Sequence, residues 1–166
     1  AGPVALTGDA RITTVGGDID LQGAVDGLAE GVGRLTLQAS SGLTTFGTPL
    51  GQTTRPAGLT VDGALVARGA RVTDSVTLGT LTLAADSTFE GNNLSFSLIT
   101  APGNAFALRI TPTGTSPRVN FGADVGAPGA DPSSITVDAG GTTQLFRTLR
   151  SAGPISFANT VSYNTG

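Results

Sequence analysis

Short apolar-polar-apolar triplets recur along the whole chain and are the strongest structural signal in the sequence. In each triplet the outer side chains point to one face of an extended chain and the middle one points to the other. Clusters of Gly, Pro, Asn or Asp separate the triplets, so the pattern predicts an all-β chain of many short strands. Clear examples are Ile19-Asp20-Leu21, Leu35-Thr36-Leu37, Val76-Thr77-Leu78, Val119-Asn120-Phe121 and Ile155-Ser156-Phe157.

Helical patterns are nearly absent. The two best stretches are residues 27–35, which Gly31 and Gly33 interrupt, and residues 145–151. Neither reaches the ~12–15 residues at which a helix becomes stable without strong packing. We therefore expect no substantial helix.

Phenylalanine recurs at one phase of a 25-residue period. Steps of 25 residues from Leu21 reach Phe46, Arg71, Phe96, Phe121 and Phe146. Four of the seven Phe therefore fall on that phase, and only Arg71 breaks the series. Such a period fits about three strands with their turns, a unit that buries its apolar side chains only by stacking on neighbouring units. We predict that these residues form one internal column: Leu21, Phe46, Phe96, Phe121 and Phe146.

The predicted architecture is a single-stranded parallel β-helix of about six to seven coils, with residues 1–166 forming one β-repeat domain. A β-sandwich is the alternative, because strands spaced 8–12 residues apart suit either fold. The fixed phase of the Phe favours the β-helix. Residues 153–161 restart the motif 36 residues after its previous copy, which we interpret as an insertion or a corner loop.

The composition removes most catalytic chemistries. The chain has 25 Gly and 9 Pro, yet it is 39% hydrophobic, which indicates an ordered fold. It has no Cys and no His, and all nine basic residues are Arg. Disulfides, thiolate zinc sites, Cys nucleophiles, His bases and Lys Schiff bases are therefore excluded. We expect no enzymatic activity and no cofactor.

Charge and hydropathy exclude two classes of partner. The net charge is −3 and the nine Arg are scattered, so no basic surface for nucleic acid is expected. No apolar run approaches the ~20 residues of a membrane span, so no membrane insertion is expected. The chain begins at Ala1-Gly2-Pro3 without Met, as an exported and processed product would, and we expect an extracellular or cell-surface location.

Three consecutive segments resemble a known family: G-D-I-D-L-Q-G-A-V-D-G, G-R-L-T-L-Q-A-S-S-G-L-T-T-F-G-T-P-L-G and A-G-L-T-V-D-G-A-L, which lie at residues 17–27, 33–51 and 57–65. They are similar to the degenerate repeats of filamentous-haemagglutinin-like and autotransporter-like bacterial surface exoproteins, whose shafts are right-handed parallel β-helices. The resemblance covers about residues 17–137, although typical shafts are many times longer. It implies an exported, non-catalytic rod for adhesion or filament building.

Only a few of the acidic residues are candidates for a catalytic role. Asp18 and Asp20 lie two apart on a predicted strand, which would place both carboxylates outward about 6.5–7 Å apart. That separation would suit a polysaccharide-cleaving pair, but solvated Asp that resists aggregation is the favoured interpretation. Glu30 and Glu90 have no evident partner.

A metal site and an ice-binding face are two further hypotheses. No calcium-binding spacing joins the remaining turn aspartates, so we predict Asx turns and no metal site at Asp9, Asp62, Asp86, Asp131 and Asp138. Outward Thr36, Thr60 and Thr136 could form part of an ice-binding face. Outward Thr is also an ordinary strand residue, and no regular T-x-T array recurs.

Neither end of the chain offers an amphipathic cap for an open coil. We therefore expect the chain to partner another copy of itself, or to belong to a longer parent chain. Association would be head-to-tail or by strand donation, with residues 1–15 completing a neighbour's sheet. A glycan or a host-surface ligand is the alternative partner.

Overall fold

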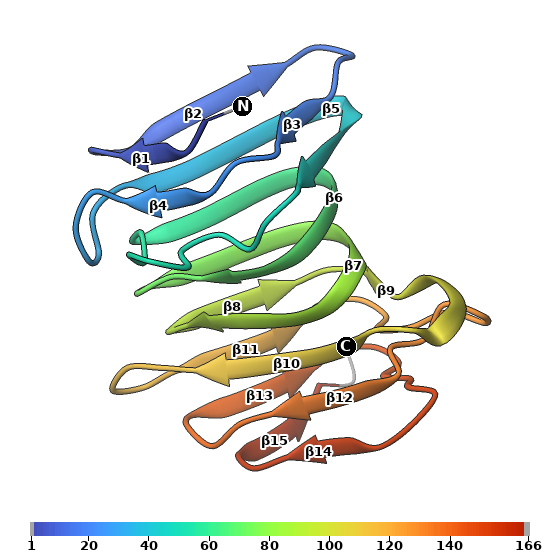
Figure 1. The fold of residues 1–166 in the computed structure, drawn as a ribbon. Helices are drawn as coiled ribbons and strands as arrows, with labels where there is room; N and C mark the ends of the chain where they lie inside the picture. Colours follow the sequence, from blue (N-terminus) through green and yellow to red (C-terminus); the bar gives the residue numbers. More distant parts are fainter. Residues whose placement is uncertain (1, 165–166) are drawn as a thin grey trace.

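The chain winds into a parallel β-helix of about eight turns, which Figure 1 shows as a stack from the blue N-terminal coil to the red C-terminal coil. This computed structural model describes residues 2–164, and no α-helix occurs within them. Every strand pairing in the described part is parallel. The β-helix prediction is therefore confirmed, and the β-sandwich alternative is wrong.

Three long strands in the middle of the chain bend around the corners of the coil: β5 (Arg34–Phe46), β6 (Gly58–Arg71) and β7 (Ser75–Gly91). Shorter strands precede them: β1 (Val4–Leu6), β2 (Ala10–Thr14), β3 (Ile19–Leu21) and β4 (Val25–Gly27). Others follow: β8 (Asn93–Phe96), β9 (Ile99–Thr100), β10 (Ala107–Pro112), β11 (Arg118–Phe121), β12 (Ser134–Val137), β13 (Thr142–Leu145), β14 (Ile155–Phe157) and β15 (Thr160–Tyr163), with a 3-10 turn η1 (Pro102–Asn104) after β9.

Strand pairings define three faces of the stack. Face A contains β2, residues 34–38 of β5, 58–62 of β6 and 75–78 of β7, then β8, β11, β13 and β15. Face B contains β3, residues 43–46 of β5, 64–67 of β6 and 80–83 of β7, then β9 and the bridges at Val125 and Leu149. Face C contains β1, β4, the bridge at Leu50, residues 69–71 of β6 and 87–91 of β7, then β10, β12 and β14.

The long strands turn from one face to the next at irregularities in the pairing. The register of β6 against β7 shifts between Val61 and Ala64 and again between Ala67 and Gly69. Gly63 and Gly69 lie at these corners with φ of 112° and 117°. Because this region of conformational space is open mainly to glycine, these two positions let the strand turn without ending.

Coil length varies, which corrects the predicted number of coils. On face A, partners in successive coils are Ile12, Leu37, Val61, Leu78, Phe96, Phe121, Leu145 and Tyr163. Their spacing is 25 and 24 residues at first and falls to 17 and 18 between Val61 and Phe96. It returns to 25 and 24 up to Leu145 and is 18 in the last coil. These short coils explain why about eight turns form where a constant period of 25 predicts six to seven.

The core lies inside the coil and consists of side chains stacked in columns. Along each strand, buried and more exposed residues alternate. In β11, for example, Val119 and Phe121 are buried, whereas Arg118 and Asn120 are more exposed. Stacking of such strands gives each face at least one inward column. One column on face A comprises Ala10, Leu35, Leu59, Val76, Leu94, Val119, Thr143 and Val161.

The predicted single aromatic column is divided between two faces. Leu21 pairs with Phe46 on face B, and Phe96 pairs with Phe121 on face A. The short coils place Phe96 in the column of Leu37, nine residues before Phe46, so the two pairs do not share a column. At the next coil Leu145, and not Phe146, pairs with Phe121.

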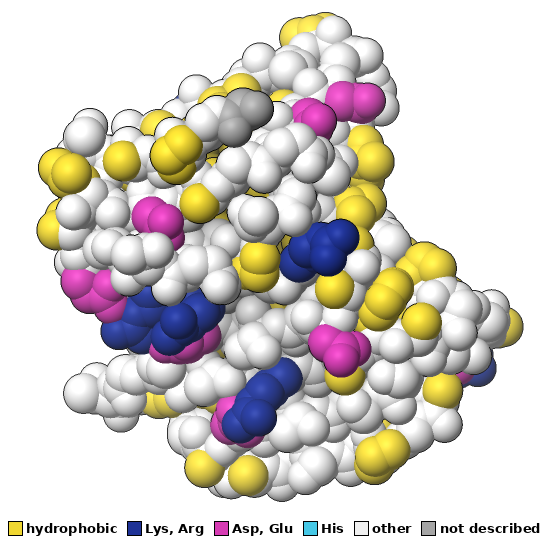
Figure 2. Space-filling model, in the orientation of Figure 1, with side chains coloured by type: hydrophobic (Ala, Val, Ile, Leu, Met, Phe, Trp, Pro, Cys, Tyr) yellow, Lys and Arg dark blue, Asp and Glu magenta, His cyan; other side chains and the backbone are white. Residues whose placement is uncertain are grey.

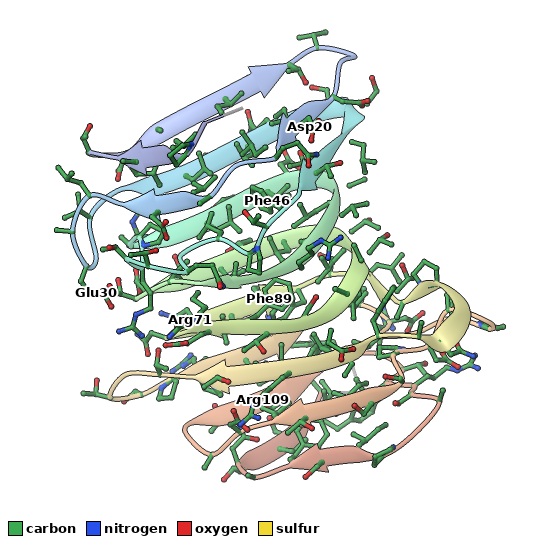
Figure 3. All side chains as sticks on the ribbon, in the orientation of Figure 1. Asp20, Glu30, Phe46, Arg71, Phe89 and Arg109 are labelled. Atoms are coloured by element: carbon green, nitrogen blue, oxygen red, sulfur yellow. The ribbon has the colours of Figure 1, made fainter. Side chains whose placement is uncertain are left out.

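Phe89, which the 25-residue period omits, completes the aromatic cluster. It belongs to face C and meets Phe96 edge-on, with ring centroids 5.3 Å apart and planes at 75°. Phe46 and Phe89 both lie within the stack in Figure 3. The buried phenylalanines thus come from all three faces of the coil.

Residues 153–161 belong to a short final coil, so the 36-residue delay before this copy of the motif is not an insertion or a corner loop. Ile155 of β14 pairs with Ile135 of β12, and Thr160 of β15 pairs with Thr142 of β13. The spacings of 20 and 18 residues belong to a short final coil, which is why the 25-residue period does not find it.

Candidate functional site

A continuous polar column runs along the outside of face A. Its residues occupy the middle position of successive face A strands and point away from the core: Arg11, Thr36, Thr60, Thr77, Ser95, Asn120, Gln144 and Ser162. Neighbouring strands in a sheet lie about 4.8 Å apart. The column therefore presents hydroxyl, amide and guanidinium groups at that interval along the stack.

The lower part of this column lines a shallow depression of about 230 Å³. Its polar lining comes from β7, β8, β11 and β13: Thr77, Asn93, Ser95, Arg118, Asn120 and Gln144. Oδ1 of Asn120 is shielded from solvent and finds no hydrogen-bond donor among the described residues. The depression offers planar amides and one guanidinium, which suit hydrogen bonding to a hydroxylated ligand.

Asp18 and Asp20 are both exposed, but their carboxylates have different partners. Asp18 precedes β3, and its Oδ1 accepts a hydrogen bond from the Leu43 amide at 2.8 Å. Asp20 points outward from β3 and accepts a hydrogen bond from the Gln22 side chain. Asp20 is labelled near the N-terminal end of the stack in Figure 3. The first carboxylate thus holds two coils together, and only the second lies on the outer surface of a strand.

Glu30 and Glu90, for which the sequence suggests no partner, belong to one ion-pair network. Arg55 donates to both glutamates, and Arg71 Nε donates to Glu90 Oε2 at 2.7 Å. The Glu90 side chain is only 13% exposed, so both of its arginine contacts are partly shielded from water. Figure 3 shows Glu30 and Arg71 on the same edge of the stack. The spacings of 19, 25 and 35 residues do not share one period, which hides the network from sequence inspection.

Hydrogen bonds to arginine stabilise several ionised carboxylates. The Arg55 backbone amide and then its side chain lower the pKa of Glu30, and the bond to Glu30 raises the pKa of Arg55. The Arg34 side chain lowers the pKa of Asp74. Burial opposes ionisation of Asp138, but hydrogen bonds from Arg109 and Thr111 outweigh it and lower its pKa.

A second depression, of about 400 Å³, adjoins this network on the outside of the stack. Its lining is Pro49, Gln52, Arg68, Arg71, Asp86, Thr88 and Glu90. Both signs of charge are present, and Arg71 already pairs with Glu90. In the space-filling view of Figure 2, basic and acidic side chains lie scattered among uncharged ones on this side of the molecule.

Most carboxylates near the corners contact the next coil along the stack. In four such contacts a side-chain oxygen accepts from a backbone amide 21 to 27 residues later: Asp9 from Arg34, Asp26 from Thr53, Asp86 from Ala107, and Asp124 from Thr148. The predicted local Asx turns at Asp9 and Asp86 are therefore contacts between coils. They satisfy amides where the strand ladder is interrupted.

The other candidate calcium ligands lie apart. Asp138 binds Arg109 and Thr111, and Asp131 binds Arg150. Asp62 lines a separate depression with Gln38 and Ser40. Within residues 2–164, no three acidic side chains gather into a group that could hold a metal ion.

The predicted outward threonines divide between two faces. Thr36 and Thr60 lie in register on face A, where Thr77 extends them to three successive coils. Thr136 lies on face C beside Arg109. Coil lengths of 24 and 17 residues separate the three face A threonines, so the sequence shows no regular array.

Both end coils of the described chain expose apolar side chains that belong to inward columns. Val4 and Ile12 in the first coil are 41% and 39% exposed. Ile155, Val161 and Tyr163 in the last coil are 42%, 40% and 63% exposed. These side chains would be buried if another strand lay beyond them.

Comparisons of the chain with protein-family models, with curated proteins and with solved structures find no match. No helix within residues 2–164 is long and apolar enough to cross a membrane.

Proposed function

We propose that this chain is a non-catalytic extracellular rod that serves a structural or adhesive role at a cell surface. One observation carries the proposal: inward columns run from the first coil to the last and reach both ends partly exposed. A stack of this kind lengthens by adding coils, because each coil contacts only its neighbours. Repeated addition of coils gives a shaft or a filament.

The use of charged side chains supports a structural role. Corner carboxylates such as Asp18 and Asp124 accept hydrogen bonds from the backbone of the next coil, and Glu90 is held by two arginines. These carboxylates thus serve to hold neighbouring coils together. The resemblance of residues 17–137 to the shafts of bacterial surface exoproteins supports an adhesive or filamentous role at the cell surface.

Solution scattering, electron microscopy and activity assays on the purified chain test this proposal together. We expect an elongated particle, filaments that become more abundant with concentration, and no cleavage of acidic or neutral polysaccharides. Compact, monodisperse globules would contradict the rod, and turnover of a polysaccharide would contradict the non-catalytic role.

Ligand binding on face A is the second candidate. The depression beside Asn120 and Gln144 favours a glycan, because its side-chain amides match sugar hydroxyls in hydrogen bonding. A glycan array tests this candidate, with Gln144→Ala expected to weaken any binding found. Ice binding by Thr36, Thr60 and Thr77 is tested by thermal hysteresis, which Thr60→Val would reduce.

Polysaccharide cleavage is the third candidate, and its test rests on Asp20 and Asp18. Loss of activity on an acidic polysaccharide in Asp18→Asn or Asp20→Asn would support it, provided that the variant stays folded. Asp20 is the better probe, because Asp18 also links β3 to β5 through the Leu43 amide.

A further inference from the structure

The strands that end faces C and A, β14 and β15, lack the features that normally protect the edge of a sheet. Edge strands usually carry charges, prolines or bulges that discourage another strand from pairing. Residues 151–164 contain no charged side chain, and their one proline, Pro154, precedes β14. Ile155, Val161 and Tyr163 are exposed along the two strands of this coil. The C-terminal edge is therefore open to a further coil.

The first coil offers surfaces of the matching kind. On face A, β2 begins the same inward columns that β15 ends, with Ala10 in the column of Val161 and Ile12 in the column of Tyr163. On face C, β1 pairs with β4, and its Val4 is half-exposed. Both strands run in the direction that parallel pairing with β15 and β14 requires.

Charge on face B distinguishes the two ends. Asp20 begins an outward column that continues through Thr45, Val66, Thr82 and Thr100, and Arg150 lies in this column at the last coil, next to the bridged residue Leu149. A second copy placed on the C-terminal end would bring its Asp20 toward Arg150. Two like ends placed together would instead face Arg150 with Arg150, or Asp20 with Asp20.

We propose that the C-terminal coil docks the N-terminal coil of a second copy of this chain, with β15 pairing β2 and β14 pairing β1 in parallel. This inference rests on the proposed rod function and names its interface. Val161 lies over Ala10, Ser162 over Arg11, and Tyr163 over Ile12. A slip by one residue would place the Tyr163 ring against the outward Arg11. The alternation of inward and outward side chains along both strands therefore fixes the register.

Among the described residues, β15 on face A is the last strand, so no described strand lies between Leu149 and β3 of the next copy on face B. Leu149 and β3 of the next copy are then separated by two strand spacings, about 10 Å. The long Arg150 side chain, which binds Asp131 in the single chain, extends across this gap toward Asp20 of the second copy. Because the two surfaces differ and do not close on each other, repeated docking gives an open filament.

Cysteine cross-linking tests the register directly, because the chain has no cysteine of its own. The double variant Arg11→Cys, Ser162→Cys places the two thiols at opposite ends of one molecule and, in the docked pair, on adjacent strands. A spacing of about 4.8 Å between those strands suits a disulfide. Mild oxidation should give a ladder of covalent multimers on a non-reducing gel.

The double variant Thr13→Cys, Ser162→Cys is the matched control. Thr13 faces the same side as Arg11 but lies two residues farther along, about 8 Å from the Ser162 position, which exceeds disulfide reach. Its cross-linking should be several-fold weaker. Equal ladders from both double variants would overturn the proposed register.

Further outcomes separate this interface from the rod function. Filaments without cross-links would overturn the interface and favour strand donation, while the rod remains. Covalent dimers alone would indicate docking of like ends and also overturn it. An elongated monomer that neither polymerises nor cross-links would overturn self-docking and leave a non-catalytic rod.

A charge exchange gives a second readout of the joint. Asp20→Arg should raise the concentration needed for polymerisation several-fold, because it faces Arg150. The double variant Asp20→Arg, Arg150→Asp should restore part of the loss. Polymerisation unchanged by Asp20→Arg, with circular dichroism showing a folded chain, would contradict the placement of face B.

Discussion

The rings of Phe96 and Phe121 stack face to face, with centroids 5.7 Å apart and planes 22° apart, although one full coil separates the residues. Both side chains are almost completely buried. Phe146, one residue after β13, lies outside this inward column and is only half-buried. The pair therefore fixes the register of two coils at the centre of the stack.

Truncation of this pair should be costly. Phe121→Ala leaves a cavity beneath Phe96 and should lower the free energy of unfolding by about 3–5 kcal/mol. Phe146→Ala is the control and should cost less than half as much. Denaturant unfolding of the two variants checks this, and equal losses would mean that Phe146 belongs to the core column.

The buried hydroxyl of Thr44 should be replaceable with a gain in stability. Thr44 lies between Ile19 and Leu65 in an inward column of face B, and its Oγ1 has no hydrogen-bond partner among the described residues. Thr44→Val removes an unpaired polar atom and should raise the free energy of unfolding by about 1 kcal/mol.

Thr143→Val is the matched control for that prediction. Thr143 is equally buried, but its hydroxyl exchanges hydrogen bonds with the Asn159 side chain at 2.9 and 3.2 Å. Its loss leaves the Asn159 amide without this partner and should destabilise the protein by about 1–2 kcal/mol. Thermal unfolding should therefore move in opposite directions for the two variants.

A close approach between coils should make Gly42 irreplaceable. A Cβ at this position would lie 2.1 Å from the Gly17 carbonyl oxygen in the preceding coil. Gly42→Ala should therefore push two coils apart and destabilise the fold by about 2 kcal/mol or more. Gly122→Ala meets only the Phe96 carbonyl oxygen at 3.6 Å and should change stability by less than about 0.5 kcal/mol, as measured by denaturant unfolding.

Acid should destabilise the fold through its arginine-bound carboxylates. The pKa values of Glu30, Asp74 and Asp138 are lowered in the folded protein, so their stabilisation is complete above the ordinary carboxyl pKa values near 4. It is lost as the pH falls from there through the lowered values. The denaturant midpoint should stay level between about pH 7 and 5 and decline below about pH 4.

Arg34→Gln tests one cause of that acid sensitivity. The Arg34 side chain is the main reason for the lowered pKa of Asp74. Its replacement should lower stability at pH 7 and flatten the decline in acid, so that the difference between variant and parent shrinks as the pH falls through the lowered pKa of Asp74. A constant difference between them at all pH values would show that Asp74 titrates independently of Arg34.

Local pattern was enough to predict the strands and the parallel stacking, because both depend on neighbouring residues and on one clear repeat. The triplets that begin at Leu35, Val76 and Val119 all lie in parallel strands of face A. The exact columns were not predictable, because the length of each corner sets the register. The shortening between Val61 and Phe96 moves Phe96 away from the column of Phe46.

The polar contacts were hidden for the same reason. Arg55, Arg71 and Glu90 come together because three coils of unequal length place them at one edge. The carboxylate of Asp18 binds an amide 25 residues later, and nothing near Asp18 in the sequence marks that amide. The partners of such side chains lie in other coils, so they can be identified only once the register between coils is known.

The direction of the hydrogen bonds in this stack has a mechanical consequence. The covalent backbone circles the long axis, whereas the bonds between strands, such as those joining β8 to β11 and β11 to β13, run along it. A tensile load applied between the two ends therefore falls on hydrogen bonds and side-chain packing, and not on covalent bonds. Compression along the long axis presses the coils together, whereas tension separates them. We therefore expect the molecule to unfold under tension from one end, one coil at a time.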